Sequence, residues 1–260
     1  MSVQSSRRYY VNSENRISGT SSNFTYTFDI PDGSNFDSCL VVDMSIPFTY
    51  YIVRTGNNFF TLRELGVDTV ITVPRGNYDA RTFATALVAL LNTNSPNGWT
   101  YSITLDMTLA KYTYTVTGNG ANQPSFILVN HLADQTGFAT FSTNTFVASL
   151  LTSTDVLNFA GPNCLYVHSD MVDDQSSILQ SLYPSNTIPF SFITKSCPDP
   201  DLYTKKLRTN NSGVFSFSVT DSDNAEIDLN GGEVVFKLML YKKLTIGDMF
   251  KKYLELGLAK

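Results

Sequence analysis

The stretch VITVPRGNYDARTFATALVALLN, residues 70–92, holds the clearest succession of local signals in the chain. It opens with the β-branched run Val70–Val73, which favours a strand. Pro74 ends that strand because proline cannot donate a hydrogen bond to a neighbouring strand. Gly76 permits a sharp change of direction. Asp79 is then a good N-cap, because its carboxylate can accept a backbone N–H from the first turn of a helix.

The helix predicted after Asp79 has one apolar face. Phe83, Leu87 and Leu91 recur at helical spacing, and Tyr78 and Phe83 stand at the two ends of a hydrophobic staple. We expect Asp79, Phe83, Leu87 and Leu91 to be structural residues. They would start this helix and hold it against a β-structure, because almost everything on either side of it predicts strands.

Most of the remaining chain predicts β-strands, and the helix above is the only convincing one in the body of the chain. Alternation of apolar and polar residues is strictest in Phe24–Phe28. About eleven strands are expected in all, which exceeds the eight of a plain jelly roll, so some would belong to an elaboration. They are expected at 24–28, 40–46, 59–62, 70–73, 99–105, 111–116, 125–129, 165–168, 188–193, 214–219 and 234–241.

Residues 1–22 are polar and lack a core pattern, so we expect an extended N-terminal arm that is ordered only by its neighbours. Arg7, Arg8, Tyr9 and Tyr10 are the side chains of this arm best suited to assembly contacts, because they combine large area with directional hydrogen bonds.

The composition suits a structural protein. Of the 260 residues, 42% are hydrophobic and 16% are charged, and the net charge is −5, which argues against a specific nucleic-acid binder. Neither a signal peptide nor a transmembrane segment is predicted. Cys39, Cys164 and Cys197 occur in no paired motif, which favours a reducing compartment.

We find no motif for catalysis, for a cofactor or for a metal, and we expect the protein not to be an enzyme. His131 and His168 have no partners at metal spacing. The acidic segment Asp221–Asp228 superficially resembles a calcium loop, but Ala225 and Glu226 replace a ligand and a glycine of that pattern. We expect a solvated loop there, and a looser cation site at a subunit interface stays open.

Several stretches, spread over most of the chain, carry a family resemblance. They are Tyr10–Tyr26, the strand, turn and helix through Leu91, the hairpin around Asp106, Thr136–Phe138, and the ending from Leu229 with its apolar strand. Together they look like the penton (vertex, or minor capsid) proteins of virophages and Polinton-type viruses.

The resemblance implies an all-β, antiparallel single jelly roll at residues 23–244. The spacing of the apolar residues at 245–260 separately predicts a short amphipathic helix, because they fall on one helical face. The resemblance adds inserted strands and loops to the jelly roll, beside the internal α-helix predicted above. It further implies a homopentamer that closes the fivefold vertices of an icosahedral virion, next to a larger major capsid protein and assembled inside the host cell. The resemblance implies no catalytic residue in this chain. Residues 142–212 match least well.

Two other function classes stay open from the sequence. One is a receptor- or glycan-binding β-sandwich, fibre-head or lectin-like, that uses loop tyrosines and carboxylates. The other is a carbohydrate-active enzyme with paired carboxylates such as Asp199 and Asp201. Glycan binding by a solitary oligomer would favour the first, and hydrolysis lost on Asp→Asn substitution would favour the second. Co-assembly with a major capsid protein would favour the penton.

Overall fold

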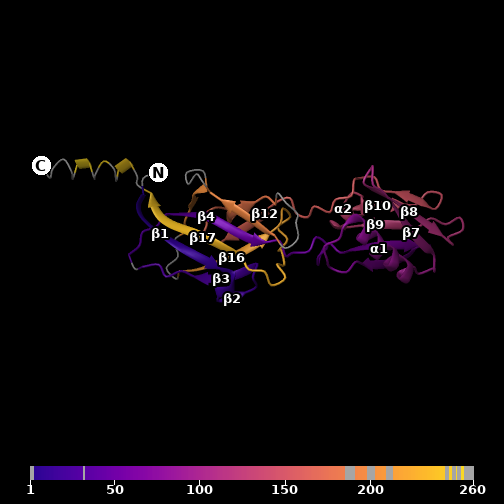
Figure 1. Ribbon diagram of the computed structural model, residues 1–260, viewed down its shortest axis with the longest axis horizontal. Coiled ribbons are helices and arrows are strands. Elements are labelled where there is room, and N and C mark those ends of the chain that lie inside the picture. The colour runs from indigo at the N-terminus through magenta and orange to yellow at the C-terminus, as the bar shows by residue number, and fades with distance from the viewer. Residues whose placement is uncertain are drawn as a thin grey trace. The chain divides into compact units, whose positions relative to one another are not determined.

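The computed structural model describes residues 3–31, 33–184, 191–197, 203–208, 213–243, 246–247, 250 and 253–254. The chain divides into two compact units. Unit 1 consists of residues 1–50 and 162–260, and unit 2 of residues 51–161. Unit 2 is therefore an insertion within the sequence of unit 1 (Figure 1).

The described residues of unit 1 form two antiparallel sheets. Sheet A has the strand order β1-β17-β4-β14, with β15 also beside β4, and sheet B has the order β13-β12-β16-β3-β2. The neighbouring strands β1, β17 and β4 are labelled in Figure 1. The elements are β1 (Val3–Asn12), the 3-10 turn η1 (Ser13–Asn15), β2 (Ser18–Gly19), β3 (Asn23–Thr27), β4 (Ser38–Pro47), β12 (Leu165–Ser169), β13 (Ile178–Leu182), β14 (Phe192–Ser196), β15 (Lys205–Lys206), β16 (Val214–Thr220) and β17 (Val235–Lys243).

The eight longer strands of unit 1 pair like the two arms of one long hairpin. The first, β1, pairs with the last, β17; β3 pairs with β16, β4 with β14, and β12 with β13. Rolling such a hairpin into two facing sheets produces the eight-stranded jelly roll. The prediction of an all-β antiparallel jelly roll is therefore confirmed, and unit 2 is inserted between its third and fourth strands.

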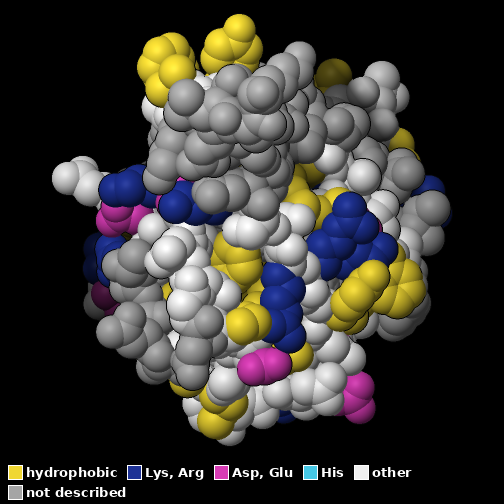
Figure 2. All heavy atoms as spheres, turned by 90° about the vertical axis from the view of Figure 1, so that its left-hand side faces the viewer, with side chains coloured by type: hydrophobic (Ala, Val, Ile, Leu, Met, Phe, Trp, Pro, Cys, Tyr) yellow, Lys and Arg dark blue, Asp and Glu magenta, His cyan; other side chains and the backbone are white. Residues whose placement is uncertain are grey.

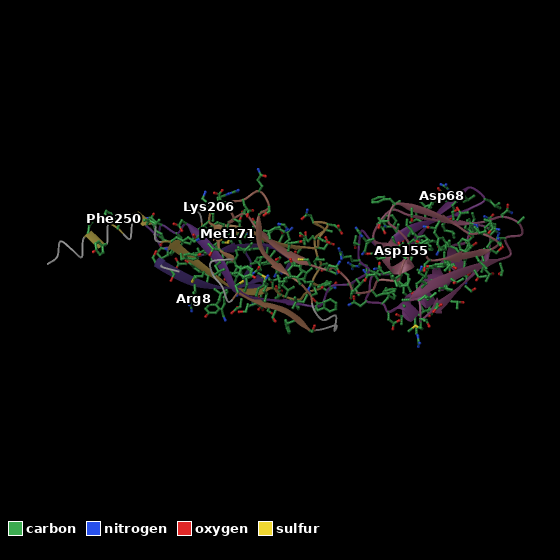
Figure 3. All side chains as sticks on the ribbon, turned by 90° about the horizontal axis from the view of Figure 1, so that it is seen from above. Arg8, Asp68, Asp155, Met171, Lys206 and Phe250 are labelled. Atoms are coloured by element: carbon green, nitrogen blue, oxygen red, sulfur yellow. The ribbon has the colours of Figure 1, made fainter. Side chains whose placement is uncertain are left out.

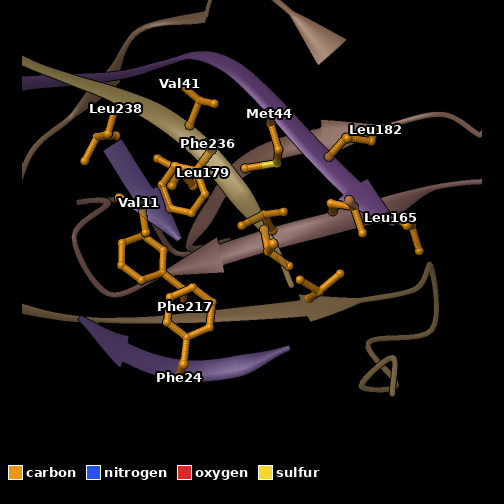
Figure 4. Packing of buried hydrophobic residues seen from close by; sticks show 14 of the residues in the cluster. Val11, Phe24, Val41, Met44, Leu165, Leu179, Leu182, Phe217, Phe236 and Leu238 are labelled. Atoms are coloured by element: carbon orange, nitrogen blue, oxygen red, sulfur yellow. The ribbon is translucent and has the colours of Figure 1, made fainter. Parts of the chain in front are cut away.

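The core of unit 1 lies between the two sheets. Val11 of β1 and Leu238 of β17 come from sheet A, and Phe24 of β3 and Phe217 of β16 come from sheet B; all four are buried (Figure 4). The rings of Phe24 and Phe217 stack with their centroids 5.4 Å apart. Burial of these apolar side chains holds the two sheets together.

The N-terminal segment differs from the predicted arm. Strand β1, within residues 1–22, pairs with β17 over nine residue pairs, and Val11 is fully buried. This strand could not be predicted from an apolar pattern because one of its core-facing positions is Arg7. Strand β1 lies at the edge of sheet A, so the charged end of Arg7 can still reach solvent. The jelly roll therefore begins at β1 and not at residue 23.

Unit 2 is built from two further antiparallel sheets, of order β10-β9-β5-β6 and β11-β8-β7, together with two helices. Its elements are β5 (Phe59–Glu64), β6 (Val67–Thr72), α1 (Ala80–Asn94), β7 (Thr100–Asp106), β8 (Lys111–Thr117), β9 (Ser125–Leu128), α2 (Leu132–Thr136), β10 (Ser142–Thr145) and β11 (Leu150–Thr152).

Helix α1 begins at a capping box around Asp79. Its Oδ1 accepts hydrogen bonds from the backbone N–H of Arg81 at 2.9 Å and of Thr82 at 2.8 Å, and Thr82 Oγ1 accepts from the Asp79 N–H at 3.0 Å. The hydrogen bonds from Thr82 lower the pKa of the Asp79 carboxyl. These contacts satisfy donors that a helix start otherwise leaves without a partner.

The apolar face of α1 packs into the core of unit 2. Phe83, Leu87 and Leu91 are each 0% exposed. The ring of Tyr78 meets the ring of Phe83 edge-on, with 5.7 Å between centroids. The helix is therefore fixed by burial as well as by its cap.

We expect Leu87→Ala to lower the free energy of unfolding by about 2–5 kcal/mol, because it removes a fully buried side chain and leaves a cavity. Chemical denaturation of the two proteins measures the difference. The exposed Thr93→Ala on the same helix is the matched control and should change stability by less than about 0.5 kcal/mol. Equal effects of the two substitutions would contradict the packing of α1.

Glu64, at the end of β5, is a fully buried carboxylate that accepts hydrogen bonds from neutral groups. Its Oε1 accepts from Ser95 Oγ at 2.8 Å and from Tyr101 OH at 2.7 Å, and its Oε2 accepts from the Asn97 N–H at 3.0 Å. Burial and the hydrogen bond to Glu64 raise the pKa of Tyr101, so this hydroxyl remains a donor. Glu64 thereby ties the connection between α1 and β7 to the sheet.

The predicted helix at 245–260 lies largely outside the described residues. Within it, the structure describes Ile246, Gly247, Phe250, Tyr253 and Leu254, and the large apolar side chains among them are exposed. Among the described residues, no helix is long and apolar enough to span a membrane.

Candidate assembly surface

The four residues predicted for assembly lie on β1 and point alternately to its two sides. Arg7 and Tyr9 turn toward sheet B. The Arg7 guanidinium lies 3.1 Å from the Asp29 carboxylate, and Tyr9 OH donates to the Asp29 carbonyl at 3.0 Å. The Tyr9 ring also packs edge-on against Phe28 at 5.1 Å between centroids. Arg7 and Tyr9 therefore make their contacts within one chain, with the residues that follow β3.

Arg8 and Tyr10 lie on the opposite, outer face of sheet A. In register, Tyr10 stands opposite Lys237 of β17, and Lys237 stands opposite Asp43 of β4. The Lys237 amine lies 5.7 Å from the Tyr10 ring centroid and 2.8 Å from the Asp43 carboxylate. The hydrogen bond to Asp43 raises the pKa of Lys237, so its cation persists. We call Arg8, Tyr10, Asp43 and Lys237 the outer patch.

The outer patch combines charge with exposed aromatic area. Tyr10 is 69% exposed and the adjacent Val235 is 44% exposed, and Arg8 lies at the surface of unit 1 (Figure 3). Figure 2 shows the molecule from the left-hand side of Figure 1. On the side seen there, Lys and Arg side chains lie beside exposed hydrophobic side chains. Large aromatic and arginine side chains are the residue types that carry most binding energy at protein interfaces.

The outer patch also lies at the edge of a sheet, since β1 is the last strand of sheet A on that side. An edge strand leaves part of its backbone without a neighbouring strand, and folded proteins usually cover or charge such an edge. Tyr26 OH donates a hydrogen bond to the Tyr10 carbonyl at 3.3 Å and thereby satisfies one backbone acceptor of this strand. The patch and the edge together form a candidate contact surface among the described residues of unit 1.

Asp43 and Lys237 could not be assigned to this surface from the sequence alone. They are 194 positions apart and are joined only by the register of β4 and β17. A signal was nevertheless present, since a lysine interrupts the apolar run of the last strand.

The structure places His168 and the Asp221–Asp228 segment in ordinary structural contacts, whereas Asp199 and Asp201 lie outside the described residues. Both ring nitrogens of His168 have hydrogen-bond partners. Asp221 Oδ1 accepts from the Asp223 and Ala225 N–H groups, and Glu226 accepts from Asn23 Nδ2 at 3.0 Å. Within the described part of the chain, no group of three or more His, Cys, Asp or Glu residues is placed to hold a metal.

The three cysteines are free and buried. Burial raises the pKa of the Cys39 thiol to about 12, so it stays protonated near neutral pH. Cys39 therefore behaves as a small apolar core residue.

No protein-family model matches the chain, and no curated protein matches it. Among solved structures, it is similar to the crystal structure of the mavirus penton protein, with 13% sequence identity and a TM-score of 0.47. The match covers 90% of this chain and 99% of that chain.

Proposed function

We propose that this chain is a minor capsid protein of the penton type. It forms homopentamers that close the fivefold vertices of an icosahedral virion, beside a major capsid protein of the same particle and assembled in the host cell.

The family-like stretches are the single observation that carries the proposal, because they occur in both units. Tyr10–Tyr26 runs from the end of β1 through β3, and the apolar strand after Leu229 is β17, both in unit 1. The strand, turn and helix through Leu91, the hairpin around Asp106 and Thr136–Phe138 belong to unit 2. A jelly roll agrees with the proposal, since viral capsid proteins use this fold, but lectins use it too.

The outer patch is the surface that we assign to subunit contacts. In a ring, each copy presents two different surfaces, one to each neighbour. Arg8 and Tyr10 lie exposed on an edge strand, and so they are available to a neighbour in a way that Arg7 and Tyr9 are not.

Expression of the chain alone tests the pentamer. Native mass spectrometry should find a species of about 144 kDa, five times the 28.8 kDa chain. Expression with the major capsid protein should then yield particles that retain the chain at a low, vertex-like ratio. A chain that stays monomeric and never copurifies with particles would contradict the proposal.

The double substitution Arg8→Ala and Tyr10→Ala should weaken pentamer formation by at least about tenfold, because it removes two anchor side chains from the contact. Its fold should survive, since both side chains point to solvent. Sedimentation against concentration measures the shift. Arg7→Ala is the matched control on the same strand, and it should leave the oligomer unchanged because Arg7 pairs with Asp29 inside one chain. Full pentamer formation by the double variant would exclude the outer patch as the contact.

A further inference from the structure

The outer face of sheet B carries a groove of about 270 Å³. Ser216 and Ser218 of the middle strand β16 form its floor, since Asn23 of β3 and His168 of β12 lie on either side of Ser218 in register. Arg208 also lines the groove. The floor is low because serine is smaller than the residues that flank it.

The walls of the groove are held in place by hydrogen bonds. Both ring nitrogens of His168 are engaged, as described above. Asp170 Oδ1 accepts from the Ser216 N–H at 2.9 Å, and the Arg208 N–H donates to the Met171 carbonyl at 2.7 Å. The groove is therefore preformed, which lowers the entropic cost of binding a ligand.

Several polar groups in the groove are unused. Among the described residues, the Arg208 guanidinium has no hydrogen-bond partner, although its charge lies near that of Asp173. The hydroxyls of Ser216 and Ser218 have no partner either, and Asn23 engages its amide nitrogen but not its side-chain oxygen. Asp170 has one oxygen bound to the Ser216 N–H and the other available. The groove thus offers a cationic donor, an anionic acceptor, an amide oxygen and two hydroxyls.

We propose that this groove binds one acidic sugar residue of a glycan. The Arg208 guanidinium would receive the sugar carboxylate through charge-assisted hydrogen bonds, and Asp170 and Asn23 would accept from its hydroxyl groups. A bare anion fits less well because the Asp170 carboxylate faces the same space, and a neutral sugar would leave Arg208 unused. A volume somewhat below the ~300–1,000 Å³ of drug-sized pockets suits a single sugar residue.

Ligand-observed NMR titration of the full-length protein tests the inference, which does not depend on the capsid proposal. The probes are N-acetylneuraminate and glucuronate, with glucose as the neutral sugar and acetate as the bare carboxylate. We expect at least one sugar acid to bind with a dissociation constant on the order of millimolar, and glucose and acetate to bind at least about tenfold more weakly.

Arg208→Ala should weaken binding of the sugar acid at least about tenfold, since it removes the charged partner of the carboxylate. Lys206→Ala is the matched control, because Lys206 is a nearby cation that pairs with Asp173 and does not line the groove. Ser218→Thr keeps a hydroxyl and suits a strand, but it adds a methyl group to the floor, so it should also weaken binding.

Thermal unfolding of each variant confirms that it folds. The inference is overturned if no sugar acid binds, if acetate or glucose binds as tightly as the sugar acids, or if a folded Arg208→Ala protein binds like the wild type. Loss of binding in the Lys206→Ala control would equally overturn it, since the charge rather than the groove would then be responsible.

Discussion

Deletion of residues 1–22 should abolish stable folding, and not merely remove an arm. The deletion takes away β1, leaves β17 without its neighbour on that side, and opens the core at Val11, which is fully buried. Burial of one such side chain is worth about 1.5–3 kcal/mol, and the nine residue pairs with β17 are lost as well. Since a domain is stable by only about 5–15 kcal/mol, unit 1 should be largely unfolded or aggregated. Circular dichroism and limited proteolysis measure this directly.

A shorter deletion, of residues 1–6, is the control. It keeps Arg7, Tyr9 and Val11, with their contacts to Asp29 and the core, and removes the exposed Ser5 and Ser6. This protein should fold and unfold cooperatively like the full chain. If the protein lacking residues 1–22 instead melted within a few degrees of the full chain, β1 would be a dispensable arm and the strand assignment would be wrong.

Glu64→Ala should destabilise the protein by at least about 3 kcal/mol, because it leaves the buried Tyr101 hydroxyl, the half-buried Ser95 hydroxyl and the Asn97 N–H without their charged acceptor. Loss of hydrogen bonds to a charged group costs more than loss of those between neutral groups. Chemical denaturation measures the free energy of unfolding, and the effect should be among the largest of any single polar substitution in the chain.

Two further substitutions serve as comparisons, one at Glu64 itself and one at an exposed carboxylate of the same hairpin. Glu64→Gln keeps one acceptor oxygen but replaces the other with an amide NH2 group. This NH2 group would face the N–H and O–H donors around residue 64, so the substitution should recover only part of the lost stability. Asp68→Asn, on the same hairpin, removes an exposed ion pair with Arg63 and should leave the free energy of unfolding almost unchanged. A Glu64→Ala protein as stable as the Asp68→Asn protein would show that the buried carboxylate contributes little.

The start of α1 could be predicted from the sequence because its signals are local. The cap at Asp79, the staple of Tyr78 and Phe83 and the buried spacing to Leu91 all lie within fourteen consecutive residues, and each follows from short-range geometry. The alternating strands Thr100–Asp106 and Lys111–Thr117 were predictable for the same reason, since period-two patterns identify a half-buried strand.

The arrangement of these elements could not be predicted in the same way. Pairing of β1 with β17 joins residues more than two hundred positions apart, and no local pattern encodes it. Strand β1 was missed because Arg7 occupies a core-facing position at the sheet edge and uses its long stem to reach Asp29. Arg8 and Tyr10 were identified by residue type, but their neighbours Asp43 and Lys237 follow only from the register of the sheet.

Cryo-electron microscopy of particles produced with and without this chain tests the capsid proposal most directly. When the chain is expressed with its major capsid protein, we predict a pentamer at each fivefold vertex, with the jelly roll of unit 1 fitting the density. Particles produced without the chain should lack that density. Vertices that look the same in both preparations would contradict the proposal.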